Sequence, residues 1–268
     1  MFIPLINPLF AMSAITFAFD KSTTEGKVTM GLLAIVSLFS WTVMITKGRQ
    51  IWLAKRATRK FYAAFRSTRD PLDLFRQKQP FNGSPAYEVF MTGAEELDYH
   101  INHHPVVSHG KTKVSPASFD FVKVAMERVV SAEGMALEKG MIILSTAVAG
   151  GPFLGLLGTV YGVMETFSGI AKANAATLTA MAPGVAGALI NTVIGLLVAI
   201  PAMFAYNLMV TQIRALTQEM DDFTSEYATQ LDHTYVDQTA THVVIDISSG
   251  GAKPVAGTTS TEPALAAS

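Results

Sequence analysis

Two long apolar stretches without charge dominate the second half of this chain. No Asp, Glu, Lys or Arg stands between Lys139 and Glu165, and none stands between Lys172 and Arg214. About 20 apolar residues, rising about 1.5 Å each in a helix, cross the hydrocarbon core of a bilayer. We therefore predict membrane-spanning helices at residues 140–166 and 181–210, joined by a periplasmic loop at residues 167–180.

A third uncharged stretch at residues 28–46 predicts the first span, with Trp41 as an interfacial anchor near its end. By the rule that basic residues flank spans on the cytoplasmic side, the side after this span is cytoplasmic and the N-terminus is periplasmic. Topology and attraction to anionic lipid account for the basic run, so no nucleic-acid partner is predicted. Between residues 47 and 69 every charged residue is basic: Lys47, Arg49, Lys55, Arg56, Arg59, Lys60, Arg66 and Arg69.

Composition agrees with a membrane protein. Hydrophobic residues make up 50% of the chain and charged residues only 15%, and the mean hydropathy is +0.33. The chain has no cysteine, which excludes disulfides, thiolate metal sites and thiol nucleophiles. The predicted fold class is all-α, an integral membrane protein with three transmembrane helices and long helices that extend into the cytoplasm.

The N-terminal segment 1–27 is predicted to be periplasmic or interfacial. Residues 2–19 are uncharged, but Pro4, Asn7 and Pro8 interrupt the first half and leave a helix at 9–19 that is too short to span comfortably. A cleaved secretory signal is the alternative, but the basic leader and a clear small-residue cleavage site are both missing.

Residues 47–139 are assigned to a cytoplasmic domain. Residues 70–116 are rich in Pro, Gly, Asn and His with weak periodicity, which predicts short helices and loops. The histidines of this segment lack cysteine partners and a helical ligand spacing, so no metal site or cofactor is predicted. They stand near Pro105 and Gly110, in what is interpreted as a loop: His100, His103, His104 and His109.

From Ser118 onward apolar residues recur at helical intervals, which predicts a helix leading into the second span. Gly134 and Gly140 mark either bends or close helix packing in it. After the third span the amphipathic pattern continues as a cytoplasmic helix at 211–238, and residues 239–268 have the composition of a disordered tail.

Small residues recur three or four positions apart within both long apolar stretches, so each predicted helix has one face that allows close approach of backbones. We predict that these two faces pack together. Neither stretch contains a catalytic arrangement, and the glycines follow no strand, so an enzyme is not predicted. The packing residues proposed are Gly155, Gly158, Gly162, Gly184, Gly187 and Gly195.

The same residues carry a resemblance to a known family. The string Gly-Leu-Leu-Gly-Thr-Val-Tyr-Gly at 155–162 precedes Ala-Pro-Gly at 182–184 and Ala-Leu-Ile-Asn-Thr at 188–192. Gly195-Leu196, Ala199-Ile200-Pro201 and Tyr206-Asn207 continue the pattern. Residues 134–229 thereby resemble the ExbB and TolQ branch of the MotA/TolQ/ExbB proton channel family.

This resemblance implies a homopentamer in the bacterial cytoplasmic (inner) membrane, with the second and third spans lining a pore. A pair of single-span ExbD/TolR-like partners would sit inside and carry the titrating aspartate. Ion flow, usually of protons, would drive work on the envelope through a TonB- or TolA-like effector, as in TonB-dependent import.

By the same resemblance Thr159 and Thr192 match the hydroxyls that face the ion path. The alternative is that each bonds a carbonyl of its own helix, as threonines in membrane helices often do. Asn191 is bulkier and more polar than the residue usual at its position. Its amide needs a partner within the bundle, and both a pore-facing and a buried orientation remain open.

One position departs from the branch. Gly187 stands where a glutamate is common in this branch. Three alternatives follow: the glutamate is dispensable to the mechanism, its role has moved to another residue, or the coupling ion and the tightness of coupling differ. Glu165 is the relocation candidate, because it lies seven residues from Gly158 and is predicted on the same helix stripe. The alternative is a solvated carboxylate at the periplasmic mouth.

A self-sufficient ion channel and a non-conducting membrane scaffold are the competing functions.

Overall fold

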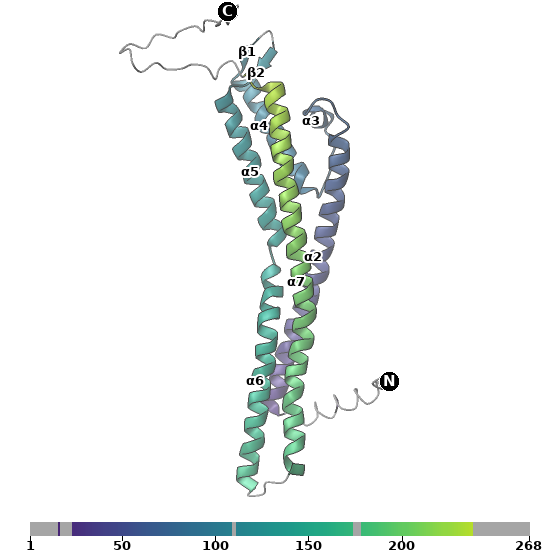
Figure 1. The fold of residues 1–268 in the computed structure, drawn as a ribbon, viewed down its shortest axis with the longest axis vertical. Coiled ribbons are helices and arrows are strands. Elements are labelled where there is room, and N and C mark those ends of the chain that lie inside the picture. The colour runs from purple at the N-terminus through teal and green to yellow at the C-terminus, as the bar shows by residue number, and fades with distance from the viewer. Residues whose placement is uncertain (1–15, 17–22, 109–110, 174–177, 238–268) are drawn as a thin grey trace, which may run out of the picture.

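The computed structural model describes residue 16 and residues 23–108, 111–173 and 178–237 as a long, mainly helical rod (Figure 1). The single sheet of the described residues is a small antiparallel hairpin in which Val107 pairs with Thr112. The elements are α2 Thr24–Phe65, α3 Asp73–Gln77, α4 Pro85–His103, β1 Val106–Ser108, β2 Lys111–Lys113, α5 Pro116–Glu138, α6 Met141–Ala173 and α7 Leu178–Tyr235.

Three of these helices are long and apolar enough to cross a membrane: α2, α6 and α7. The spans predicted at 28–46, 140–166 and 181–210 fall within them, apart from residue 140. We call α6 with residues 24–46 of α2 and 178–210 of α7 the apolar bundle. The polar bundle comprises α3, α4, α5, the hairpin and the remainder of α2 and α7. Because α2 and α7 run unbroken through both bundles, they join the bundles into one rod (Figure 1).

The connection between the second and third spans is more helical than predicted. Residues 167–173 belong to α6, and α7 already begins at Leu178. Thr166 lies against Gly184, so the two helices still pack together at the predicted end of the second span, directly before residues 167–173. This contact between distant segments supports helix formation where the local sequence indicates a loop.

Residues 85–103 form one long helix, so the prediction of short helices and loops is wrong there. Ser84 caps α4 by accepting a hydrogen bond from the Tyr87 backbone N–H at 3.3 Å, and Pro85 occupies the first turn. His100 and His103 therefore lie in the last turn of α4 and not in a loop, while His109 is outside the described residues. Burial of one face of α4 against the polar bundle stabilises a helix whose periodicity is weak; that face includes Val89, Phe90, Ala94 and Leu97.

The two glycines at the entry to the second span have different roles. Gly140 lies between α5 and α6 with a φ of 89°, a left-handed conformation that glycine adopts without steric penalty. Gly134 lies within α5, where an added Cβ would be 3.5 Å from Thr217 Oγ1. Gly140 thus marks the bend, whereas Gly134 lies in the α5–α7 contact at a distance where a Cβ would also fit.

The polar bundle has an aromatic core. Phe61, Phe65, Phe90, Phe223 and Tyr227 are buried, and adjacent ring centroids lie 5.2 to 6.0 Å apart. These rings come from α2, α4 and α7. Such burial of apolar area is the main force that holds helices together in water.

A hydrogen-bonded clasp closes the far end of the polar bundle. The Tyr235 hydroxyl donates to Asp70 Oδ1 at 2.8 Å, and Arg76 Nη1 donates to Asp70 Oδ2 at 2.9 Å. Partial burial acts to raise the pKa of Asp70, but these bonds and one from the Leu72 N–H lower it below its ordinary value. Burial and the Asp70 carboxylate raise the pKa of Tyr235 to about 12. The clasp joins the segment after α2 to the end of α7.

Two sequence predictions lie outside the described residues. They are the interfacial helix at 9–19, of which only Thr16 is described, and the disordered tail at 239–268.

Candidate functional site

The α6–α7 interface is built from small residues at successive helical turns. A Cβ added at Gly151 would lie 3.1 Å from Ala199 Cβ, and one added at Gly195 would lie 2.6 Å from the Gly151 carbonyl oxygen. At Gly155 it would lie 2.9 Å from the Asn191 carbonyl oxygen, and at Gly162 it would lie 2.7 Å from Ala188 Cβ. No side chain therefore fits at these glycines, and the two backbones nearly touch.

Thr159 and Thr192 flank this contact. Both are half-buried in the single chain, at the border between the α6–α7 contact and the surface. Thr159 Oγ1 donates to the Leu156 carbonyl oxygen at 2.6 Å, which is the helix-internal bond considered above. A hydroxyl that donates its proton still has lone pairs that accept a hydrogen bond. The Thr159 hydroxyl can therefore accept from water or from a protonated acid while it remains anchored to α6.

Asn191 lies inside the chain and is fully buried between three helices. Its side chain faces Gly158 of α6 and Thr29 of α2, whose Oγ1 is 3.4 Å from Asn191 Oδ1. Thr29 was not singled out in the sequence, although a polar residue within an apolar span is itself a signal. Of the two orientations considered for Asn191, pore-facing and buried, the single chain shows the buried one.

Glu165 is exposed and lies outside the buried small-residue stripe. Gly151, Gly155, Gly158 and Gly162 are buried, and the next contact toward α7 is made by Thr166 beside Gly184. A seven-residue step returns to within about 20° of the starting direction, so the exposure of Glu165 follows from how α6 packs against α7 and not from its spacing to Gly158. Gly187 is also buried, one turn before Asn191 on α7.

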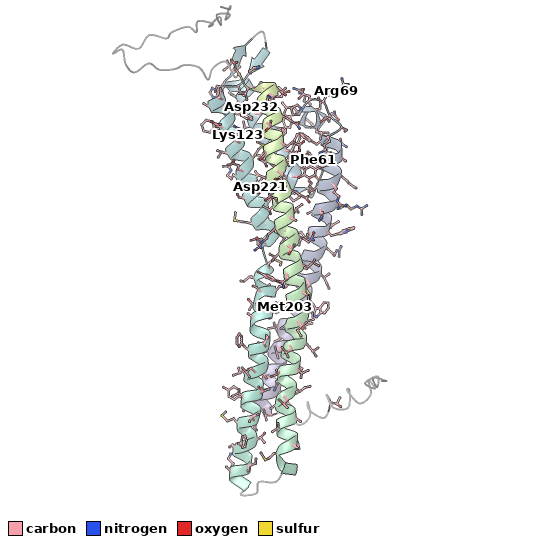
Figure 2. The ribbon with its side chains drawn as sticks, in the orientation of Figure 1. Phe61, Arg69, Lys123, Met203, Asp221 and Asp232 are labelled. Atoms are coloured by element: carbon pink, nitrogen blue, oxygen red, sulfur yellow. The ribbon has the colours of Figure 1, made fainter. Side chains whose placement is uncertain are left out.

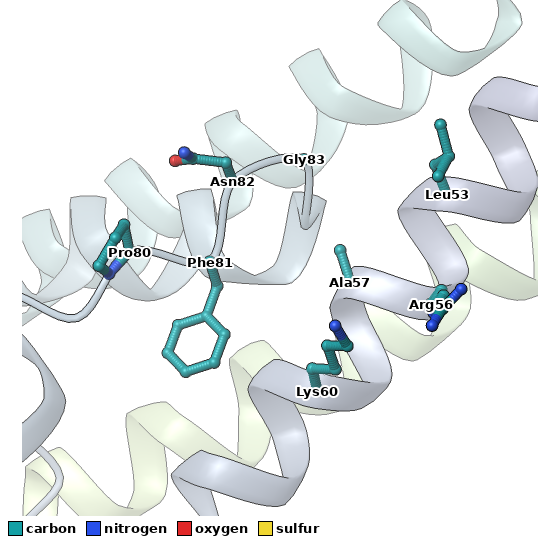
Figure 3. Close-up of a pocket in the computed structure, with 8 residues that line it drawn as sticks. All are labelled: Leu53, Arg56, Ala57, Lys60, Pro80, Phe81, Asn82 and Gly83. Carbon is teal, nitrogen blue, oxygen red and sulfur yellow. The ribbon is translucent and has the colours of Figure 1, made fainter.

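A groove of about 610 Å³ lies on the polar bundle, away from these residues (Figure 3). It runs between α2 and the segment that leads into α4, with Arg56 and Lys60 on one wall and Phe81 on the other. The Arg56 guanidinium stacks over the exposed Trp52 ring at 5.5 Å. This surface follows directly after the first apolar stretch and is basic, as the sequence predicted. In the described ranges no three His, Asp or Glu residues gather as a metal site would require.

These features define a class of protein. It is a helical protein with three helices able to span a membrane, two of which pack through glycines and present hydroxyl groups beside the contact. Figure 2 shows the side chains along the rod, with Met203 on the apolar bundle and Phe61 and Asp221 on the polar bundle.

Comparison with known proteins then gives the family. The model of the MotA/TolQ/ExbB proton channel family matches residues 87–222. The biopolymer transport protein ExbB of Pseudomonas putida is 32% identical over 222 residues, which are 81% of this chain and 64% of that protein. The Tol-Pal system protein TolQ of Pseudomonas aeruginosa is 34% identical over 203 residues, 75% of this chain and 85% of the relative. The Tol-Pal system protein TolQ of Haemophilus influenzae is 30% identical over 217 residues, which are 80% of this chain and 91% of that protein. The chain belongs to the MotA/TolQ/ExbB proton channel family.

Proposed function

We propose that this chain is the ExbB/TolQ-like subunit of a motor in the bacterial inner membrane that is driven by an ion gradient, most simply of protons. With an ExbD/TolR-like partner it energises envelope processes such as TonB-dependent import. The observation that carries the proposal is the glycine-packed α6–α7 pair with Thr159 and Thr192 at its border. Relatives of both ExbB and TolQ type support the motor class, and they do not favour one envelope process over another.

The proposed assembly is a homopentamer around two copies of the single-span partner. One side of the α6–α7 pair is covered by α2, and large apolar side chains elsewhere on the pair remain exposed in the single chain. Such surface requires lipid or neighbouring subunits to cover it. Examples of these exposed side chains are Phe153, Leu157, Leu189, Leu197 and Phe204.

The proposed orientation places the polar bundle in the cytoplasm. Arg56 and Lys60 lie beyond the end of the first apolar stretch and are followed by more basic residues. The end of α6 that carries Glu165 then lies at the periplasmic side. There the Glu165 carboxylate, which is exposed in the single chain, attracts cations toward the entrance.

In this proposal the titrating acid belongs to the partner, and this chain supplies hydroxyl groups along its path. Thr159 and Thr192 accept hydrogen bonds from water or from the protonated acid, which lowers the cost of holding a polar group within the membrane. No chemical bond is made or broken in this chain, so its role is that of a pathway and not of an enzyme.

The deciding experiment is the mass and composition of the complex, purified in mild detergent after expression with the neighbouring genes. A pentamer that holds a single-span partner with an aspartate near the start of its span supports the motor. Recovery of this chain alone contradicts it and leaves the two competing functions, a self-sufficient channel or a scaffold. Gly187, at the position of the family glutamate, favours these two functions over the motor. Ion flux in liposomes distinguishes the channel from the scaffold.

A further inference from the structure

Three helices meet at a buried polar contact that the proposed function does not use. We call Thr29 of α2, Gly158 of α6 and Asn191 of α7 the polar node. Asn191 is fully buried, and Thr29 is only 7% exposed. The surroundings are apolar, so the hydrogen bonds within the node decide whether burial of its amide is tolerated.

The hydrogen bonds of the node favour one orientation of the Asn191 amide. Thr29 Oγ1 lies 2.8 Å from the Gly26 carbonyl oxygen and 3.4 Å from Asn191 Oδ1, but a hydroxyl has one proton and cannot donate to both. Asn191 Nδ2 has no partner among the described residues. Because side-chain amide oxygen and nitrogen are assigned from their hydrogen bonds, we rotate the amide by 180°.

The rotated amide satisfies the buried donor. Asn191 Nδ2 then donates to Thr29 Oγ1, and Thr29 donates its own proton to the Gly26 carbonyl oxygen. This relay ties α7 to the first turns of α2, which Thr23 caps by accepting from the Gly26 N–H at 3.1 Å.

Gly158 closes the node from the side of α6. A Cβ at this position would lie 2.7 Å from Asn191 Cβ and Cγ and 2.7 Å from Thr29 Oγ1. No side chain fits there, so α6 lies directly against the relay. Rotation of either α6 or α7 about its own axis would break this contact.

The residues that follow the node in sequence are the two threonines of the proposed ion path. Thr159 follows Gly158, and Thr192 follows Asn191. Successive residues of a helix point about 100° apart, so holding Gly158 and Asn191 inward turns both threonines to the border of the pair. Both are half-buried there.

We infer that Asn191 is a positioning residue whose hydrogen bond to Thr29 sets the rotation of α7 against α2 and α6, and thereby the orientation of Thr192 and Thr159. Asn191 does not itself line the ion path. The orientation of the two threonines is argued from the described contacts. Their role in the ion path rests on the proposed function.

The test uses the natural absence of cysteine, which leaves an introduced cysteine as the single thiol of this chain. Thr192→Cys and, separately, Val193→Cys are modified with a thiol reagent in the intact complex with its partner, in membrane vesicles. Each is combined with Thr29→Val or Asn191→Leu, which remove the hydrogen bond with little change of shape. Thr29→Ser retains the hydroxyl. Thr42→Val is the matched control, because Thr42 is exposed on α2 and bonds only its own helix, at Leu38.

We expect Thr29→Val and Asn191→Leu to change the ratio of the two labelling rates about tenfold in favour of residue 193, the effect of one hydrogen bond on an equilibrium. Thr29→Ser and Thr42→Val should keep the parental ratio. An unchanged ratio in an assembled Thr29→Val complex overturns the inference. Loss of assembly in both Thr29→Val and Asn191→Leu, with Thr29→Ser intact, also overturns it and assigns the node a purely structural role.

Coupled transport, measured in Thr29→Val and Asn191→Leu without an introduced cysteine, separates this inference from the proposed function. A changed labelling ratio with normal transport supports the positioning role and contradicts the use of the threonines. A changed ratio with reduced transport supports both.

Discussion

At the scale of single residues, hydroxyl and carboxyl groups in this protein act through the atoms they touch. Thr159 bonds to the carbonyl of Leu156 and still offers lone pairs, so its anchoring and its proposed function are compatible. The buried Asn191 beside it illustrates the converse, because a polar residue in a span need not face an aqueous path.

Thr159→Val and Thr192→Val are expected to leave the oligomer intact and to lower coupled transport about tenfold each, since each removes one hydrogen-bonding group from the path. Energised uptake in cells and complex mass from the same preparation measure the two effects. Serine variants retain the hydroxyl and serve as controls. Full transport in both valine variants would remove these residues from the site.

The clasp at Asp70 predicts a defined dependence of stability on pH. Because the pKa of Asp70 is lowered on folding, its ionised form stabilises the folded state, and this contribution is present above about pH 4. It is lost as the pH falls below that value toward the pKa of the folded state. The pKa of Tyr235 is raised from 10.0 to about 12, so its contribution is present below pH 10 and is lost as the pH rises toward 12.

Asp70→Asn should lower the free energy of unfolding by about 1–2 kcal/mol at neutral pH, through loss of charge-assisted hydrogen bonds at a partly exposed site. Thermal unfolding of the complex between pH 3 and 7 measures it, and the variant should show a flatter profile below pH 4. Asp120→Asn is the control, because the Asp120 side chain is 72% exposed on α5 and pairs with Lys123 at 3.5 Å, outside the clasp. Equal profiles for Asp70→Asn and the parent would contradict the assignment.

At the scale of elements, the α6–α7 contact depends on the absence of side chains along one line. Carbonyl oxygens of one helix occupy the places where Cβ atoms of the other would stand, so a larger residue has no route for relaxation within the pair.

Gly155→Leu and Gly195→Leu are therefore expected to separate the helices and abolish assembly. Gly150→Leu is the matched control, because a Cβ there has no neighbour within 4 Å and the residue lies on the same helix. Size-exclusion profiles of the solubilised complexes measure the outcome. Normal assembly of the Gly155 and Gly195 variants, or equal loss in the Gly150 variant, would refute the packing argument.

At the scale of the whole molecule, the two bundles differ in what holds them together. The polar bundle has an apolar interior and a polar surface, whereas the apolar bundle has glycine contacts inside and large apolar side chains outside. Because α2 and α7 are continuous, a rotation of either helix in the apolar bundle would also turn its part in the polar bundle.

Phe61→Ala should destabilise the polar bundle by about 3–5 kcal/mol, because the fully buried ring is removed from the aromatic core and leaves a cavity. Proteolysis of the polar bundle in the solubilised complex measures the effect. Trp52→Ala is the control, since this ring is 60% exposed on the same helix. Similar protease resistance of Phe61→Ala and the parent would contradict this account of the core.

The sequence by itself determined the three apolar spans, the faces of small residues on α6 and α7, and the continuation of the third span as an amphipathic helix. These properties depend on local charge and periodicity, which are readable in a single chain. The motif from Gly155 to Gly162 also carried the family, which the comparisons confirm.

Only the tertiary structure decided which of two adjacent residues faces inward. It placed Asn191 against Thr29 across 162 residues of sequence, left Glu165 exposed where Thr166 continues the contact, and assigned the bend to Gly140 and not to Gly134. The helix at 85–103 likewise owes its stability to a core built from distant segments. Periodicity gives the shape of a helix, but its rotation about its own axis is set by contacts with helices that are far away in the sequence.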